Sequence, residues 1–128
     1  MRRHNQGFTL IELLVVVAII GIISAVSVVA YSGYKSSAEQ KQAEITLNTI
    51  YLAEQEYKSN NGEYYFNAST SNLVTNLFDG VDDLSEQSYT FKTTDVSSLT
   101  ITATKKTNTS CTISITEKNK KPNISSAC

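Results

Sequence analysis

A predominantly apolar segment runs from Phe8 to Ala30 in this chain of 128 residues. Glu12 is the only formally charged residue within it. About 20 apolar residues in a helix, rising 1.5 Å each, span the hydrocarbon core of a bilayer. The segment is therefore predicted to form a membrane-spanning helix. Because a carboxylate inside such a helix is costly, Glu12 is expected to have a partner or a function.

A short basic leader, residues 1–7, precedes this segment. A secretory signal peptide is cut after its apolar region, whereas the Gly7–Phe8 junction lies before it. Cleavage there would keep the anchor and free an amine at Phe8, four residues from Glu12. The basic flank predicts a cytoplasmic N-terminus and an exported region over residues 31–128. An ordinary anchored membrane protein is the alternative, but it leaves the leader and the glutamate unexplained.

The run Gly7-Phe8-Thr9-Leu10-Ile11-Glu12-Leu13, with the apolar residues after it, resembles the class III signal of type IV pilins and pseudopilins. In that family a prepilin peptidase cuts after the glycine and methylates the new terminal phenylalanine. The resemblance implies that residues 1–7 are removed and that Phe8 becomes the N-methylated terminus. It also implies that Glu12 meets the terminal amine of another subunit during assembly. Many type IV pilins have a kinking proline where this chain has Val29, which puts a melted stretch there in doubt.

The helical pattern continues over residues 31–60, where apolar or small residues recur at steps of three or four. Leu47, Ile50 and Tyr57 are expected to face the head, whereas charged residues between them, Glu54 included, suit a solvated face. Asn60-Asn61-Gly62 is a plausible C-terminal stop. One helix of about 50 residues is therefore predicted, with residues 8–30 as its membrane half.

Residues 61–88 are expected to form an irregular loop with a short apolar stretch from Leu73 to Phe78. Apolar and Thr-rich positions then alternate with period two in three segments, as expected of strands with one buried face. These segments are Tyr89–Lys92, Leu99–Thr104 and Cys111–Thr116. Their short connections favour an antiparallel sheet over residues 89–116, followed by a C-terminal loop. The predicted fold is α+β: a long N-terminal helix continuing into a small head with an antiparallel sheet.

Cys111 and Cys128 are the only cysteines. In an exported domain a disulfide between them is the expected state, closing a loop worth roughly 3 kcal/mol by loop entropy. Two free thiols or a metal pair remain alternatives. In the pilin family a late pair of this kind bounds a C-terminal loop. The major pseudopilin usually lacks the pair, so the cysteines favour a pilin.

Two polar clusters are candidate binding sites. The first is a group of late lysines, which would form a basic patch able to contact DNA phosphates if the hairpin lies near the C-terminal loop. Its members are Lys105, Lys106, Lys118, Lys120 and Lys121. The second is the acidic turn with Asp79, Asp82 and Asp83, whose oxygens could bind calcium. Solubilising lysines and a solvated turn are the favoured interpretations.

No pattern of catalytic residues is recognisable, so we expect neither enzymatic activity nor a cofactor. The resemblance favours a structural subunit of a type IV pilus, major or minor, which serves adhesion, motility or DNA uptake. The alternatives are a pseudopilin of type II secretion and a minor pilin that binds DNA. Expected partners are other subunits, prepilin peptidase and the assembly machinery of the inner membrane, with DNA less favoured. The chain would first cross the inner membrane once and then enter the filament, at the cell surface or in the periplasm.

Overall fold

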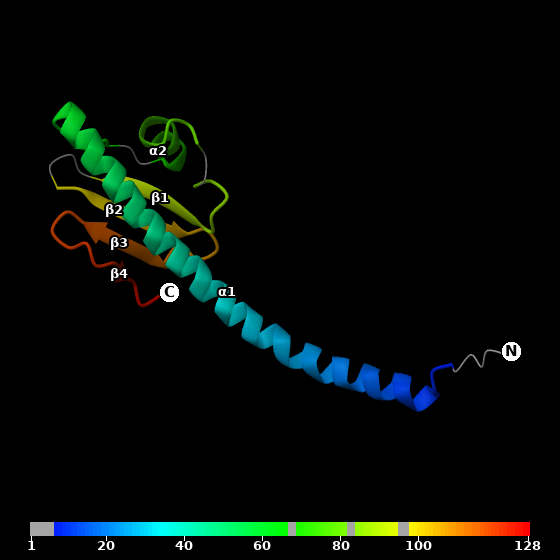
Figure 1. The fold of residues 1–128 in the computed structure, drawn as a ribbon. Coiled ribbons are helices and arrows are strands. Elements are labelled where there is room, and N and C mark those ends of the chain that lie inside the picture. The colour runs from blue at the N-terminus through cyan, green and yellow to red at the C-terminus, as the bar shows by residue number, and fades with distance from the viewer. Residues whose placement is uncertain (1–6, 67–68, 82–83, 95–97) are drawn as a thin grey trace, which may run out of the picture. The chain divides into compact units, whose positions relative to one another are not determined.

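The computed structural model describes residues 7–66, 69–81, 84–94 and 98–128. In these ranges two helices precede four strands (Figure 1). Their bounds are α1 Leu10–Asn61, α2 Thr70–Leu77, β1 Tyr89–Thr94, β2 Thr100–Lys105, β3 Thr112–Thr116 and β4 Asn123–Ile124. The chain divides into two compact units, Met1–Ser37 and Ala38–Cys128, and α1 contributes to both.

In the N-terminal unit the helical part is the first part of α1, which begins at Leu10. Its large apolar side chains from Leu10 to Val28 are between 50% and 81% exposed. α1 is one continuous helix of 52 residues, and its backbone stays helical through position 29. The predicted long helix is thus confirmed. Apolar side chains point outward all round this part of it, so nothing within the described chain covers them.

The end of α1 depends on a glycine. Gly62 has φ +86°, in the left-handed region, and its N–H donates to the carbonyl of Lys58 at 2.8 Å. A glycine adopts this conformation without a steric penalty and is the usual residue just after a helix. The predicted stop at Asn60-Asn61-Gly62 therefore agrees with the structure.

The second unit is the head, in which the four strands form one antiparallel sheet in the order β1-β2-β3-β4. Phe91 pairs with Ala103, and Ile101 pairs with Ile115. Because side chains alternate along a strand, these apolar residues share one face, and the threonines of β2 and β3 lie on the other. The predicted antiparallel sheet is confirmed, and Figure 1 shows α1 running across one of its faces.

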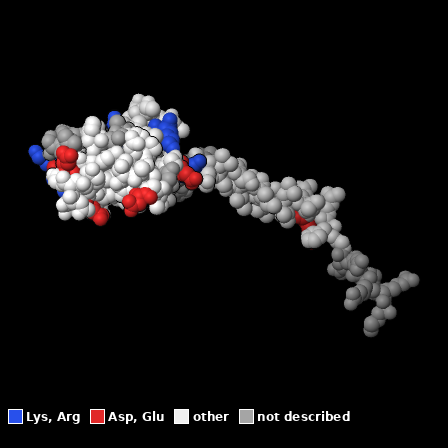
Figure 2. All heavy atoms as spheres, turned by 90° about the horizontal axis from the view of Figure 1, so that it is seen from above, with Lys and Arg blue, Asp and Glu red and all other residues white. Residues whose placement is uncertain are grey.

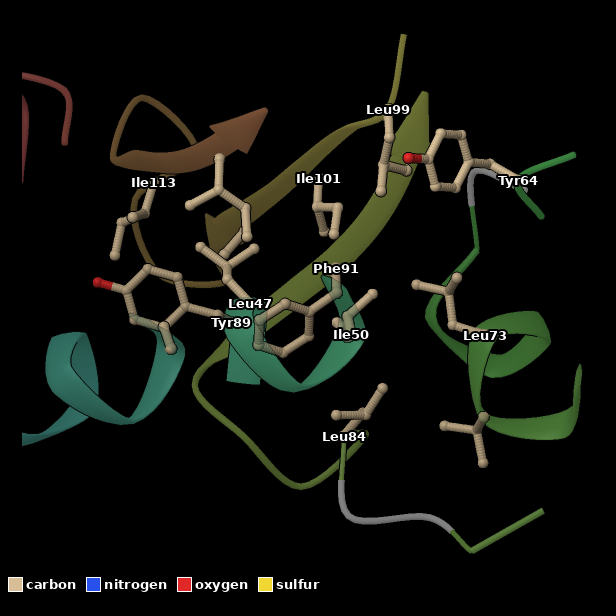
Figure 3. Close-up of a cluster of buried hydrophobic side chains, with 14 of the residues drawn as sticks. Leu47, Ile50, Tyr64, Leu73, Leu84, Tyr89, Phe91, Leu99, Ile101 and Ile113 are labelled. Carbon is tan, nitrogen blue, oxygen red and sulfur yellow. The ribbon is translucent and has the colours of Figure 1, made fainter. Parts of the chain in front are cut away.

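The hydrophobic core lies between that face and α1. Leu47 and Ile50 of α1 are fully buried, as are Ile101 and Ile113 of the sheet. Figure 3 shows these side chains meeting Phe91 in one cluster. At roughly 25 cal/mol per Å² of buried apolar surface, each such side chain contributes about 2 kcal/mol. The sheet thus holds the second half of α1 in place.

The position of Glu54 differs from the prediction. Its side chain was expected on the solvated face of α1, but it is fully buried. The reason is helical geometry: Glu54 follows Ile50 by four residues and Leu47 by seven, so it continues the buried stripe. One carboxylate oxygen accepts the N–H of Tyr65 at 2.8 Å. Tyr57, which was expected in this stripe, is only half-buried.

Two further elements were not predicted. Part of the expected loop 61–88 is helix α2, which buries Leu73 and Val74. The Thr70 hydroxyl at its start accepts the N–H of Phe91 at 3.0 Å and donates to the carbonyl of Phe91 at 3.1 Å. α2 thereby covers part of the open edge of β1, which limits edge-to-edge association. The C-terminal loop contains β4, which pairs Ile124 with Ile113.

Candidate processing and assembly site

Gly7 and Phe8 form the predicted cleavage junction, and both are exposed. A side chain added at Gly7 would meet no atom within 4 Å. Packing within the described chain therefore does not require a glycine at this position. Phe8 is 90% exposed, the largest value among the exposed large apolar residues. The leader before position 7 lies outside the described residues.

Glu12 is held by Thr9 in a reciprocal cap at the start of α1. The Thr9 N–H donates to Glu12 Oε2 at 2.8 Å, and the Thr9 hydroxyl donates to the same oxygen at 2.8 Å. The Glu12 N–H in turn approaches Thr9 Oγ1 at 3.3 Å. This is the capping-box arrangement, in which two otherwise unpaired donors of a helix end are satisfied. The carboxylate therefore has partners within its own subunit.

Thr9 is not among the residues to which the resemblance gives a role. The signal was nevertheless present in the sequence, because Thr-x-x-Glu ahead of an apolar run is the capping-box pattern. The structure thus shows Thr9 in direct contact with Glu12, one of the predicted site residues.

A groove of about 380 Å³ runs beside Glu12. It is lined by Phe8, Ile11, Glu12, Val15 and Val16, so a single charged side chain borders an otherwise apolar hollow. Such a lining suits a group that combines one positive charge with apolar surface. Among the described residues, α1 is the one helix that is long and apolar enough to cross a membrane.

Comparison with known proteins adds one match. Residues 2–28 fit the family described as "Prokaryotic N-terminal methylation motif". The chain carries the methylation motif. This motif is typical of type IV pilins and pseudopilins, and the fold of a long N-terminal helix before an antiparallel sheet is pilin-like. The apolar helix is compatible with anchoring in the inner membrane before assembly. No curated protein and no solved structure matches this chain.

Cys111 and Cys128 form a disulfide, which fixes the end of the chain to the head. Cys111 is buried next to the start of β3, and its Cα lies 4.5 Å from that of Cys128. The Asn108 side chain donates to the carbonyl of Ala127 at 3.1 Å, which ties the β2–β3 connection to the same segment. The pairing expected of an exported head is therefore present in the structure.

The five late lysines do not come together. Thr104 pairs with Thr112 at one end of the β2–β3 hairpin, and Thr100 pairs with Thr116 at the other. The β2–β3 and β3–β4 connections therefore lie at opposite ends of the sheet. The first end holds Lys105 and Lys106; the second holds Lys118, Lys120 and Lys121. Figure 2 accordingly shows positive side chains in separate places on the head.

Several of these lysines also have local contacts. Lys105 Nζ lies 3.8 Å from Glu39 Oε2, and Lys106 donates to the carbonyl of Ser85. Lys120 Nζ lies 5.3 Å from the ring centre of Tyr51. These lysines therefore contact neighbouring residues of the head.

The acidic turn is described only in part. Asp79 is exposed, with φ 51° beside Gly80 at φ 81°. Asp82 and Asp83, the other two calcium candidates, lie outside the described residues. Within the ranges that the structure describes, no group of three or more histidine, cysteine or acidic residues could hold a metal.

Two carboxyl groups of the head have shifted pKa values. Burial raises the pKa of Glu54 to about 7, against a smaller opposing effect of the Tyr65 N–H. The pKa of Glu117 is lowered, mainly by the hydrogen bond from the Tyr64 hydroxyl at 2.8 Å and further by Lys58. Lys58 also lies over the Tyr64 ring at 4.1 Å. These contacts join the end of α1 to the β3–β4 connection.

Proposed function

We propose that this chain is a structural subunit of a type IV pilus. The observation that carries the proposal is the uncovered apolar surface of the first part of α1, which begins with the methylation motif and contains one carboxylate. A helix that is apolar all round is stable only in lipid or among similar helices. Such a helix would first anchor the subunit in the inner membrane and then pack with its neighbours in a filament.

Assembly would begin with processing after Gly7, which frees and methylates the amine of Phe8. The Glu12 carboxylate would then neutralise the amine of a neighbouring subunit. Because both charges are withdrawn from water, an unpaired carboxylate would be strongly unfavourable. The pair therefore favours one axial register over others. A head-to-tail contact that does not close into a ring generates a helical polymer.

The second candidate is a pseudopilin of type II secretion, because the same motif is typical of that class. The Cys111–Cys128 disulfide supports the pilus, since the resemblance places such a pair in pilins more than in the major pseudopilin. Deletion of the gene in its host distinguishes the two. Loss of surface filaments is expected for a pilin, whereas loss of secreted proteins from the medium would identify a pseudopilin.

The assembly role is tested with Glu12→Gln, which keeps the size of the side chain and removes its charge. The processed variant should accumulate in the membrane while sheared filaments decrease strongly. Glu56→Gln is the control, because Glu56 is exposed on the head portion of the same helix. Filaments at the normal level in Glu12→Gln would refute the proposed pairing.

DNA capture is not part of the proposal, because the two lysine groups lie at opposite ends of the sheet. Any DNA binding through phosphates should weaken steeply with salt. Weak binding or none is expected of the processed protein at physiological salt. Tight, salt-sensitive binding that is lost when Lys118, Lys120 and Lys121 become glutamine would instead support a DNA-binding minor pilin.

A further inference from the structure

The Glu12 carboxylate is bound asymmetrically. Both Thr9 donors, the backbone N–H and the hydroxyl, reach Oε2 at 2.8 Å. Among the hydrogen bonds of the described residues, none ends at Oε1. Thr9 therefore fixes the carboxylate through one oxygen and leaves the other for a second partner.

The surroundings of the carboxylate indicate what that partner is. Glu12 borders the groove otherwise lined by Phe8, Ile11, Val15 and Val16, so the second partner has to combine a positive charge with apolar surface. The phenylalanine that becomes the N-terminus after processing has both, as an amine beside an aromatic ring. A second copy of this chain thus supplies a group of matching chemistry.

We propose that Thr9 is a positioning residue, which holds the Glu12 carboxylate in the conformation that receives the N-terminal amine of a neighbouring subunit. The inference rests on the pilus-subunit function proposed above. A free glutamate side chain loses considerable rotamer freedom when it is fixed. Thr9 imposes that order before the neighbour arrives, so less of the pairing energy is spent on ordering the side chain.

The cap also has a consequence before assembly. A carboxylate withdrawn from water without hydrogen bonds is strongly unfavourable, and the two Thr9 donors supply part of what water would provide. Thr9 therefore makes the charged form of Glu12 easier to keep near the lipid until a neighbour binds it. A serine at position 9 would retain both donors, whereas valine would keep the shape of threonine and lose the hydroxyl.

The test compares Thr9→Val and Thr9→Ser in the full-length chain, expressed with excess prepilin peptidase and the assembly machinery. The amount of filament is divided by the amount of processed subunit, which intact mass identifies. Thr9→Val should lower this ratio about tenfold, the effect expected from losing one hydrogen bond to a charged group. Thr9→Ser should restore it to near the wild-type value. Ser27→Ala is the matched control, because it removes a hydroxyl within the same apolar segment that donates to the carbonyl of Ile23 at 2.8 Å, within its own helix.

A double variant separates positioning from a general effect on the helix. If Thr9 acts through Glu12, adding Thr9→Val to Glu12→Gln should reduce assembly little beyond Glu12→Gln alone. Additive losses, or a normal ratio in Thr9→Val, would overturn the inference. A Thr9→Val chain that stays uncleaved despite excess peptidase would also overturn it, because Thr9 would then act in processing. Normal assembly of Glu12→Gln would refute the proposed function itself, so the two failures are distinct.

Discussion

Replacing Glu54 with glutamine should stabilise the head at neutral and alkaline pH. Glu54 is fully buried, and its Oε2 accepts the N–H of Tyr65, while its Oε1 has no hydrogen-bond partner among the described residues. An ionised carboxylate in such a place lacks the solvation that water gives it. Glutamine keeps the shape and an oxygen that can accept the same N–H, but it carries no charge.

The magnitude follows from the pKa of Glu54, which burial raises from 4.5 to about 7. Each pKa unit corresponds to about 1.4 kcal/mol, so the shift is worth up to about 3 kcal/mol. The folded-state pKa is the higher one, so this contribution to stability is fully present below pH 4.5. Between pH 4.5 and about 7 the unfolded chain releases its proton first, and the free energy of unfolding falls as pH rises. Above about pH 7 the loss is complete and constant.

The measurement is the Tm of the processed full-length protein in detergent, followed by near-UV circular dichroism of its tyrosines, since the chain has no tryptophan. At pH 8, Glu54→Gln should melt up to about 12–24 °C above the wild type, at about 4–8 °C per kcal/mol for a head of this size. At pH 4 the two should melt at similar temperatures. The exposed Glu56 provides the control variant Glu56→Gln. If the difference in Tm between Glu54→Gln and the wild type is the same at pH 4 and at pH 8, the reasoning is refuted.

Three further predictions concern processing and the head. Intact mass should show a mature chain that starts at methylated Phe8, and a mature chain that retains the leader would contradict the motif. Replacing both Cys111 and Cys128 with alanine should lower the free energy of unfolding by about 3 kcal/mol in urea titrations. An unchanged free energy of unfolding would show that closing this loop does not stabilise the head. Glu117→Gln should flatten the loss of stability toward acid. The Tyr64 hydrogen bond lowers the pKa of Glu117. The ionised Glu117 therefore contributes to the free energy of unfolding above its unfolded-state pKa, and this contribution disappears as pH falls through the folded-state pKa. If the acid part of the stability–pH curve is the same in Glu117→Gln, that hydrogen bond does not contribute.

Residues with a strong local signal could be predicted from the sequence. The apolar run from Phe8 to Ala30 predicts α1 because its length and uniformity leave few alternatives. The alternation in Leu99–Thr104 predicts a strand with the observed buried face, since period two is specific to strands. Gly62 marks the end of α1 because a positive φ strongly favours glycine. In each case the local sequence and the tertiary packing favour the same structure.

Other features depend on tertiary contacts. α2, with the sequence TSNLVTNL, consists mostly of weak helix formers, and burial of Leu73 and Val74 outweighs their propensity. β4 has two residues and is defined by its pairing with β3. Glu54 was placed on the solvated face because of its charge, although its spacing from Ile50 puts it on the buried stripe. Spacing was the better guide there.

The separation of the lysines could have been inferred from topology alone. In an antiparallel meander, successive connections alternate between the two ends of the sheet. Lys105 and Lys106 follow the second strand, whereas Lys118 and Lys120 follow the third, so one patch would require a different strand order. The exact contacts of each lysine, such as that of Lys105 with Glu39, could not be inferred, because they depend on how α1 packs on the sheet.

The composition of α1 explains why so few polar atoms would control assembly. When a helix leaves lipid to pack among similar helices, it exchanges one apolar environment for another, so the hydrophobic effect gives little preference. Exposed apolar side chains such as Val15 and Val16 can supply similar contact area in many axial registers of neighbouring helices. Glu12 differs, because Thr9 holds its carboxylate through Oε2 only, so the other oxygen is satisfied only where a further donor meets it. The two residues would therefore select the register, while the apolar residues stabilise whichever register is selected.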